Sequence, residues 1–571
     1  MEKINLKNFK KNNIFWLVLS ALLLVPAAWA LFVPGFYGAS DDIHIAWLFE
    51  MHKILMSGQI PPRFVPDLSF GFGYPLFNFV FPLPFYLAEI FHLLGFNLVD
   101  SIKALFFLSL PLSGIFMYLM LRQFISKGLS LSGAILYIYT PYRSTDLYVR
   151  GAIGEIVSFI FLPLIVLSVI KLSVYTPSSI KNTLSWIGIG ALSLAGLILT
   201  HNITAYMFFP FVMLFWLLRI FFLAPRNKQN YIVLFSTIFL GLLISCYFWV
   251  PALLDSNLMK YDTVFNFADH FPTLMQLIKP YWGYGASVPG PYDGMSFFLG
   301  IANIAILIIG IFLTIIFWSK FSKDKKILLV WAFICIFFAV FLMNYRSTFL
   351  WRTIPLLPFF QFPWRFLILT TFSIPIFVVT LDKFPFVRYT PFFVILLTLT
   401  TSGSYFRPQD FLERKDNYFL DRYIPIPFAS LEYFKTREEY LRLPKYTDTR
   451  PDKNYPPVYT NSGKINNVIR INDLNALVEV NSEGGMRLNY SKYYFPGWIA
   501  KIDNQDTPII AGIPFGQISV TVSPGAHKVE FLFKETNFKK LLDAISLGCF
   551  LVSLWLVKNL WIRSKKIGRF W

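Results

Sequence analysis

The sequence has few of the residue types that usually mark a soluble enzyme site, with three cysteines and six histidines in 571 residues. All three cysteines, Cys246, Cys335 and Cys549, lie inside apolar segments, which excludes a disulfide framework and a cysteine zinc site. The sequence also lacks a P-loop, and it has no GxGxxG, HExxH or GxSxG motif in a suitable context. A function must therefore be sought in other side chains.

Acidic residues are scarce as well, because 32 Asp and Glu stand against 51 Lys and Arg, which gives a net charge of +19. Many basic residues lie at the ends of apolar runs, where they act as topology signals, so the charge does not indicate a nucleic-acid partner. Hydrophobic residues make up 56% of the chain, Phe alone occurs 64 times, and the mean hydropathy is positive. These values require lipid as the solvent and predict an integral membrane protein.

Twelve apolar runs are candidates for membrane-spanning helices, each of which needs roughly 20 residues to cross upright. They are residues 14–33, 99–121, 128–141, 152–170, 183–200, 203–223, 231–253, 295–318, 327–344, 366–381, 387–403 and 541–557. With this set the basic loops alternate so that both termini face the cytoplasm, as the positive-inside rule requires. No convincing small-residue cleavage site follows the first run, so we expect an uncleaved anchor. The proline-containing stretch 75–94 is expected to stay on the outer side as a re-entrant or surface segment.

The composition divides the chain into three parts. Residues 1–403 form the membrane domain, in which 34–98 is a long outer loop. In residues 404–537 charges of both signs mix with turn residues, and short alternating runs such as 476–480 predict an extracytoplasmic antiparallel β-sandwich. Residues 538–571 form a last span and a basic cytoplasmic tail. The expected fold is a polytopic α-helical membrane protein of about 12 transmembrane helices with a C-terminal β-sandwich domain.

Within the membrane domain the acidic residues lie almost entirely on the predicted outer side. Only Glu2, Asp324 and Asp382 lie on the inner side. Because acidic residues contribute little to membrane orientation, this bias needs another reason, and a site on the outer face is one.

Two adjacent carboxylates, Asp41 and Asp42, follow the first span where it emerges into water. One interpretation is an N-cap pair at the start of a short surface helix, which is worth about 1 kcal/mol. The other is a catalytic base, or a ligand of Mg²⁺ or Mn²⁺, which prefer carboxylate oxygens. Asp42 together with Asp146 is the candidate metal-binding pair.

A second polar cluster lies between the third and fourth spans and contains Arg143, Asp146, Arg150 and Glu155. Asp146 and Arg150 are four residues apart, so one helical turn would make them an ordinary surface ion pair, with Arg143 reaching the lipid headgroups. In the functional interpretation, Asp146 or Glu155 completes an acidic site. Arg150 and Arg143 then bind a phosphate, for which the planar guanidinium is suited.

Two further candidates lie at the outer ends of spans. His201 stands in a very short turn between the fifth and sixth spans, and it is either a structural residue or a phosphate ligand and general acid. Arg365 follows Trp364 at the start of the tenth span, where it either anchors the helix at the interface or binds an anionic lipid head group.

Several short motifs occur together in this chain. They are Asp41-Asp42, Gly71-Phe72-Gly73-Tyr74-Pro75, Pro82-Leu83-Pro84-Phe85-Tyr86, Gln361-Phe362-Pro363-Trp364-Arg365-Phe366, Tyr493-Tyr494-Phe495-Pro496-Gly497-Trp498 and Pro524-Gly525-Ala526-His527-Lys528-Val529. This set resembles bacterial membrane proteins labelled "6-pyruvoyl-tetrahydropterin synthase-related" and the related YfhO-type proteins. The resemblance implies the GT-C superfamily, whose members transfer a sugar from a polyprenyl-phosphate carrier on the outer face.

The resemblance also implies roles for acids at two positions. In such enzymes an acid in the first outer loop is the catalytic base or a metal ligand, and Asp41 and Asp42 occupy that position. The loop between the third and fourth spans often carries a second acidic group, which Asp146 and Glu155 match by location.

The sequence thus predicts a GT-C-like glycosyltransferase of the bacterial cell membrane. Its predicted partners are a polyprenyl-phosphate-linked sugar, membrane lipids and a glycan, lipid or protein acceptor, and its predicted cofactor is Mg²⁺ or Mn²⁺. Asp41 or Asp42 would take the proton of the acceptor hydroxyl, while Arg150, with Arg365 or His201, neutralises the phosphate. The alternatives are a transporter or flippase of lipid-linked glycans and a non-catalytic envelope assembly protein. The β domain near Trp498 would either bind acceptor glycan or cap the site.

Overall fold

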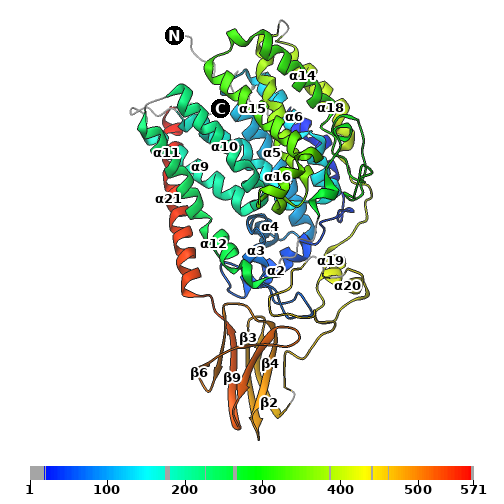
Figure 1. The fold of residues 1–571 in the computed structure, drawn as a ribbon, viewed down its shortest axis with the longest axis vertical. Coiled ribbons are helices and arrows are strands. Elements are labelled where there is room, and N and C mark those ends of the chain that lie inside the picture. The colour runs from blue at the N-terminus through cyan, green and yellow to red at the C-terminus, as the bar shows by residue number, and fades with distance from the viewer. Residues whose placement is uncertain are drawn as a thin grey trace.

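The structure is a computed structural model that describes residue 19 and residues 21–173, 180–224, 227–260, 266–384, 387–436, 438, 441–460 and 462–567. The predicted cytoplasmic N-terminus, residues 1–18, and the end of the basic tail, 568–571, lie outside the described residues. Helices gather at one end of the molecule and strands at the other, and the long helix α21 (Asn537–Ile567) runs along one side of the helical region (Figure 1). The predicted combination of a polytopic helical region with a C-terminal β domain is confirmed.

Seven helices among the described residues are long and apolar enough to cross a membrane. They are α5 (Leu98–Leu121), α8 (Ile153–Leu172), α9 (Ile180–Thr200), α10 (Asn202–Leu223), α15 (Lys323–Met343), the helix that contains α17 (Leu367–Ser373) and its 3-10 continuation Ile374–Lys383, and α21. An eighth span is added if α11 (Lys228–Ile244) and the helix that begins with α12 (Cys246–Leu254) count as one, because they meet at a bend of 70°.

The other four predicted spans are shorter helices. They are residues Ala21–Phe32, α6 (Lys127–Ile138), α14 (Ile301–Ile316) and α18 (Thr390–Ser402). Each predicted span therefore corresponds to a helix, and α6, α14 and α18 are shorter than the apolar runs that predicted them, whereas residues 14–18 of the first run lie outside the described residues.

The outer loop 34–98 contains α2 (His44–Met56), α3 (Leu76–Phe79) and α4 (Leu83–Leu93). The stretch 75–94 is thus divided between two short helices. The longer one, α4, covers about 17 Å at 1.5 Å per residue, which is too little to cross a membrane upright. This agrees with the expected surface position.

Further short helices lie between the spans. They are α7 (Pro141–Ser144), a π-helix (Thr145–Arg150), α13 (Leu274–Ile278), α16 (Thr348–Thr353), α19 (Asp416–Tyr423) and α20 (Leu431–Thr436). The carboxylate of Asp416, at the start of α19, accepts hydrogen bonds from the backbone N–H groups of Leu98 (2.9 Å) and Val99 (3.0 Å). It therefore satisfies free donors at the N-terminus of α5 and fixes α19 there.

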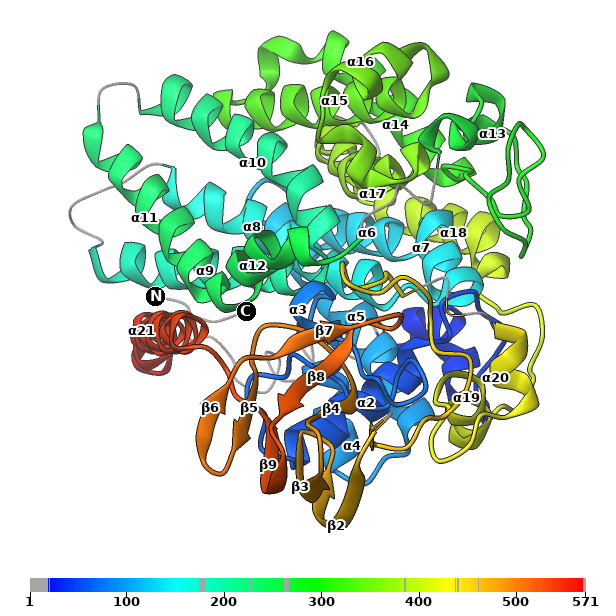
Figure 2. The ribbon, with the colours of Figure 1, turned by 60° about the horizontal axis from the view of Figure 1, so that its bottom comes forward.

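Nine strands among the described residues form two antiparallel sheets, in the orders β1-β4-β8-β7 and β2-β3-β9-β5-β6. Their bounds are β1 Val458–Thr460, β2 Lys464–Asn472, β3 Asn475–Ser482, β4 Met486–Tyr493, β5 Trp498–Ile502, β6 Gln505–Thr507, β7 Ile510–Gly512, β8 Gln517–Val522 and β9 Gly525–Phe533. Alternate residues of β3 are buried, as the sequence pattern predicted. Seen from this end of the molecule, the strands lie over α2 and α4 (Figure 2).

Aromatic contacts fix the β domain to the outer loop. The buried ring of Phe72 packs against Tyr493 and Phe515, with both centroids at 5.5 Å. Trp498 is only 6% exposed, and its ring packs against Phe64 at 5.5 Å. Trp498 therefore joins the two parts of the molecule and offers no open face to an acceptor glycan.

Candidate active site

The candidate site begins where the chain leaves the first helix and runs beside the π-helix. The backbone N–H of Asp41 donates a hydrogen bond of 2.7 Å to the carbonyl of Arg150. The next residue, Gly151, has a φ of +69°, and a Cβ on it would lie 3.1 Å from the Cβ of Ala39. A glycine here permits both the left-handed backbone and the close approach, which brings Asp41 beside Arg150.

Asp146 and Arg150 both lie on the π-helix, a rare wide helical turn that is frequent at functional sites. Arg150 Nη1 lies 2.7 Å from Asp146 Oδ1, so the pairing predicted from their spacing is confirmed. The pair does not lie on the surface, because the Asp146 side chain is fully buried.

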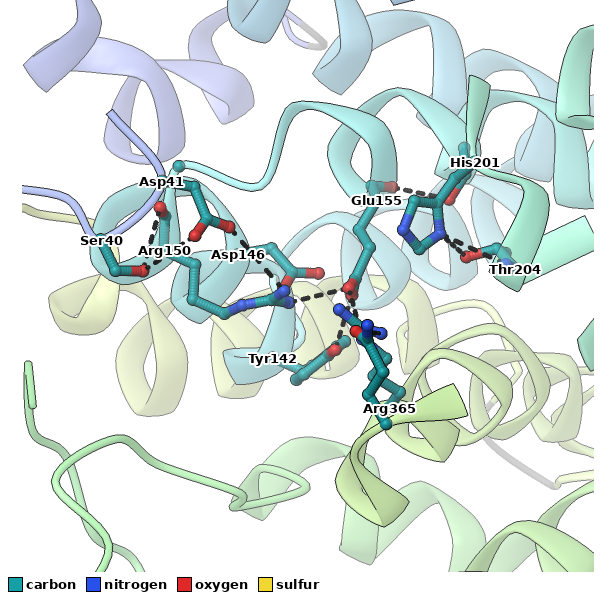
Figure 3. Close-up of polar contacts among 12 residues, drawn as sticks. Ser40, Asp41, Tyr142, Asp146, Arg150, Glu155, His201, Thr204 and Arg365 are labelled. Atoms are coloured by element: carbon teal, nitrogen blue, oxygen red, sulfur yellow. Dashed lines mark hydrogen bonds and ion pairs between the residues drawn. The ribbon is translucent and has the colours of Figure 1, made fainter. Parts of the chain in front are cut away.

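Arg150 also contacts two carboxylates from other segments. Its Nη1 lies 3.0 Å from Glu155 Oε1, and its Nη2 lies 4.0 Å from Asp41 Oδ2. Arg365 Nε lies 3.3 Å from the same Glu155 oxygen. We call Asp41, Asp146, Arg150, Glu155 and Arg365 the ionic cluster, and Figure 3 shows it running from Asp41 to Arg365. The structure thus brings together five of the predicted site residues.

Two aromatic residues complete the cluster. The Tyr142 hydroxyl donates a hydrogen bond of 2.7 Å to Glu155 Oε2. The Arg150 guanidinium lies over the Trp364 ring, 4.9 Å from its centroid. Sequence reasoning missed Tyr142, because nothing in its spacing links it to an acid thirteen positions later. For Trp364 it gave an interfacial anchor or a contact with an anionic lipid head group, and not a contact with Arg150.

The acids of the cluster differ in access to water. The Asp41 side chain is 39% exposed, whereas those of Asp146 and Glu155 are almost wholly buried. Burial raises the pKa of Asp146 well above its usual value, and the neighbouring Glu155 raises it further, against the influence of Arg150. Asp146 Oδ2 has no hydrogen-bond partner among the described residues. Asp41 is therefore the carboxylate of the cluster that a substrate can reach.

Asp42 lies apart from the ionic cluster and faces α19. Its carboxylate accepts a hydrogen bond from the Tyr423 hydroxyl and lies 3.9 Å from Arg414 Nη1. Burial raises the pKa of Asp42, although Tyr423 and the arginines of this segment oppose the shift. The N-cap of α2 is Ile43 and receives no side-chain hydrogen bond, so neither aspartate caps that helix. The two adjacent aspartates therefore contact different residues, Asp41 facing Arg150 and Asp42 facing Tyr423.

His201 has a structural task. It is the N-cap of α10, and its Nδ1 accepts a hydrogen bond of 3.2 Å from the backbone N–H of Thr204. Burial lowers the pKa of His201 to about 3, so the ring is neutral at pH 7. Figure 3 shows it on the far side of Glu155 from Asp41. The contacts favour the structural interpretation, and a role in phosphate binding stays a prediction.

Arg143 does not reach toward headgroups, because it is only 3% exposed. Its guanidinium lies 4.7 Å from the centroid of the Phe159 ring and 5.0 Å from that of Tyr137. Neither terminal nitrogen has a hydrogen-bond partner among the described residues. Burial lowers the pKa of Arg143 to about 10, which leaves it charged at pH 7. A buried and unpaired cation of this kind is suited to an anionic ligand.

The predicted divalent cation does not fit the donors as they lie. Asp42 is bonded to Tyr423 and Asp146 to Arg150, so the two predicted ligands serve separate partners. In the part of the chain that the structure describes, no three His, Cys, Asp or Glu side chains are placed to share a metal ion. The guanidinium of Arg150 lies where such an ion would stand. No step below uses a metal.

A small hollow of about 30 Å³ lies between α8, α9, α10 and α11, with Ile165, Leu194 and Phe208 among its lining residues. Ile165 is about 15 Å along α8 from Glu155, at 1.5 Å per residue. Its apolar lining and its distance from Glu155 separate the hollow from the ionic cluster.

Comparison with known proteins gives distant likenesses. No known protein family matches the sequence. An uncharacterized protein of Lactococcus lactis subsp. cremoris (strain MG1363) is 26% identical over 258 residues, which are 43% of this chain and 41% of the relative. The chain thus spans less than half of that relative.

Solved structures that resemble this chain include ArnT from Cupriavidus metallidurans and an oligosaccharyltransferase from Archaeoglobus fulgidus. ArnT from Cupriavidus metallidurans in the apo state gives a TM-score of 0.36 at 12% identity, over 65% of this chain and 60% of that one. The same protein bound to undecaprenyl phosphate gives 0.34 at 12% identity, over 64% and 60%. The apo oligosaccharyltransferase from Archaeoglobus fulgidus gives 0.41 at 14% identity, over 69% and 55%.

Proposed function

We propose that this chain is an integral membrane glycosyltransferase of the GT-C type. It would transfer a sugar from a polyprenyl-phosphate-linked donor to a glycan, lipid or protein acceptor on the outer face of a bacterial cell membrane. The motif resemblance supports the class, including the finer likeness to YfhO-type proteins. The observation that carries the proposal is the ionic cluster, in which acids and arginines from three distant segments meet beside one accessible carboxylate, Asp41.

In this proposal Asp41 is the general base. Its side chain is the accessible acid of the cluster, and its closest basic group in the cluster lies 4.0 Å away, so the carboxylate keeps capacity to accept a proton. The acceptor hydroxyl loses its proton to Asp41 as its oxygen bonds to the anomeric carbon. The bond from that carbon to the phosphate oxygen breaks, and its electron pair leaves with the polyprenyl phosphate.

The leaving phosphate needs cations that are not already neutralised. With all groups ionised, the three carboxylates of the cluster exceed its two arginines by one charge. Arg365 is ion-paired with Glu155 through its Nε, whereas both terminal nitrogens of Arg143 make no hydrogen bond among the described residues. We assign the donor phosphate to these free donors, since guanidinium groups bind phosphate oxygens well.

Purified full-length protein in nanodiscs tests the proposal. A panel of radiolabelled polyprenyl-phosphate sugars would be offered with cell-envelope acceptors, and transfer of label would be followed for wild type and Asp41→Asn. Asp410→Asn is the matched control, because Asp410 is an exposed aspartate outside the cluster. Transfer that Asp41→Asn abolishes and Asp410→Asn leaves intact supports the proposal. Movement of a lipid-linked sugar across the bilayer without any bond change would instead favour a transporter.

A further inference from the structure

We propose that Arg150 is the permanent cation of the candidate active site and that the ionic cluster works without a divalent metal ion. The mechanistic meaning of this inference rests on the proposed function, because it concerns how charge is held at the same site. Its test reads metal binding and not sugar transfer, so the two proposals fail separately.

The geometry of Arg150 is the first argument. One nitrogen, Nη1, lies 2.7 Å from Asp146 Oδ1 and 3.0 Å from Glu155 Oε1. The second terminal nitrogen faces the Asp41 carboxylate at 4.0 Å. Three carboxylates therefore surround one guanidinium, as they would surround a bound cation.

The chemistry of the guanidinium is the second argument. It cannot be deprotonated in a protein, so it keeps its charge at every working pH. Although burial opposes the charged form, Glu155 and Asp146 raise the pKa of Arg150 well above its usual value. A divalent ion among the same oxygens would stand next to this positive charge and be repelled by it.

The surroundings of Arg150 are the third argument, because they hold the side chain in place. The guanidinium lies over the Trp364 ring at 4.9 Å and is only 10% exposed. The backbone carbonyl of Arg150 accepts a hydrogen bond of 2.7 Å from the backbone N–H of Asp41. The two residues are therefore joined through their backbones as well as through their side chains. To admit a metal ion, the Arg150 guanidinium would have to move away from the Trp364 ring and from the carboxylates of Asp146 and Glu155, whose charge it neutralises.

Removal of Arg150 should create the metal site that the wild-type chain lacks. Asp146 Oδ1 and Glu155 Oε1 both lie within 3.0 Å of Nη1, so they are at most about 6 Å apart. Two oxygens bound to one small divalent ion lie up to about 4 Å apart, given bonds of about 2.1 Å. Small side-chain rotations would therefore bring both carboxylates onto one ion, with Asp41 as a third ligand.

Titration with Mn²⁺, followed by loss of the electron paramagnetic resonance signal of the free ion, tests this directly. The full-length chain in nanodiscs would be compared with Arg150→Ala, Arg150→Lys and Arg150→Ala combined with Glu155→Gln. Arg219→Ala is the matched control, because Arg219 is a buried arginine paired with a single carboxylate, Asp324. We expect Arg150→Ala to gain about one bound Mn²⁺ per chain, and the added Glu155→Gln change to abolish that gain. Arg150→Lys and Arg219→Ala should gain none.

Two results would overturn the inference. One is Mn²⁺ binding by the wild-type chain that Glu155→Gln or Asp146→Asn removes, because the cluster would then hold a metal together with Arg150. The other is a folded Arg150→Ala chain that binds no more Mn²⁺ than wild type. If Arg150→Ala does not fold, Arg150→Gln takes its place, and the comparison of wild type with Glu155→Gln decides by itself.

Discussion

The ionic cluster and the ion pairs at the opposite end of the helices use the same residue types differently. At that opposite end Arg219 of α10 is ion-paired with Asp324, and Lys325 is ion-paired with Asp382. Each carboxylate there contacts one base. In the ionic cluster Arg150 alone contacts three carboxylates, and one of them stays open to water.

Arg150 and Arg219 are alike in burial and in their contact with an aromatic ring, but they differ in the number of carboxylates that they contact. Arg219 is buried, and its guanidinium lies 5.4 Å from the centroid of the Phe215 ring, much as Arg150 lies over Trp364. A one-to-one pair needs no function beyond joining helices. A cluster with surplus acid keeps a carboxylate whose charge is not fully neutralised, and that is the arrangement a general base requires. The excess of acidic residues on the predicted outer side therefore reflects the cluster only in part, since other acids there form ion pairs of their own, such as Asp100 with Lys103.

The largest expected effect is a difference in the rate of sugar transfer between variants of the adjacent Asp41 and Asp42. Asp41→Asn should lower the rate of sugar transfer roughly 100-fold to 10,000-fold, the range that a general base contributes. Asp42→Asn should lower it by less than about tenfold, because Asp42 faces Tyr423 and not the cluster. Initial rates in nanodiscs at equal protein concentration measure both. Equal losses in the two variants would contradict the separate roles.

The next effect is the loss of folding stability when each of the two buried arginines, Arg150 and Arg219, is replaced. Arg150→Met keeps most of the side-chain volume but leaves two buried carboxylates without their cation, which should cost about 3 kcal/mol. Arg219→Met leaves Asp324, whose side chain is 39% exposed, so solvent screening limits the cost to about 1 kcal/mol. Thermal unfolding midpoints in nanodiscs should fall further for Arg150→Met. A larger fall for Arg219→Met would show that the cluster is not more tightly held than a simple pair.

A smaller effect concerns the support of Asp42 by α19. Tyr423→Phe removes a hydroxyl that donates to a buried carboxylate, which should cost about 1–2 kcal/mol of folding stability. Transfer by the protein that remains folded should be nearly unchanged. Tyr418→Phe, on the same helix, is the control, because the Tyr418 ring contacts the Arg414 guanidinium and not the Asp42 carboxylate. If Tyr423→Phe lowered transfer as much as Asp41→Asn, Asp42 would have to be placed in the catalytic machinery.

A further effect is a pH dependence of folding stability that comes from His201. Its pKa is lowered to about 3, so the folded chain favours the neutral ring, whereas the unfolded chain binds a proton below about pH 6.5. The stability from this group is complete above pH 6.5 and is lost as the pH falls toward 3, by up to about 1.4 kcal/mol per unit. His201→Asn, which can still cap α10, should flatten the acid side of the stability curve.

Unfolding midpoints between pH 7 and pH 4.5 measure that slope. His92→Asn serves as the control, because His92 is a half-buried histidine away from the cluster. Some slope should remain in His201→Asn, since burial also lowers the pKa of His44. An unchanged slope would mean that the ring of His201 is not held neutral.

The sequence predicts the features that depend on local pattern. Apolar runs must reach a certain length to cross lipid, so each predicted run coincides with a helix, and seven or eight of these helices among the described residues are long enough to cross a membrane. The spacing of Asp146 and Arg150 predicted their contact for the same local reason. The spacing could not predict that this pair is buried. The surface ion pair that the same spacing allowed is not found in the structure.

Long-range contacts were beyond the sequence. Asp41 and Asp42 are neighbours, and only the fold shows that one faces Arg150 and the other Tyr423, 381 positions away. The contact of the Tyr142 hydroxyl with Glu155 likewise depends on two segments that meet in space. No periodicity in a single chain encodes such partners.

A cryo-EM map of the full-length chain in nanodiscs with added polyprenyl phosphate tests the central claim most directly. Phosphate density is expected within hydrogen-bond distance of Arg143, with the Asp41 carboxylate on the same side and Arg150 still between Asp146 and Glu155. Phosphate bound away from these residues, or an Asp41 that stands apart from Arg150, would contradict it.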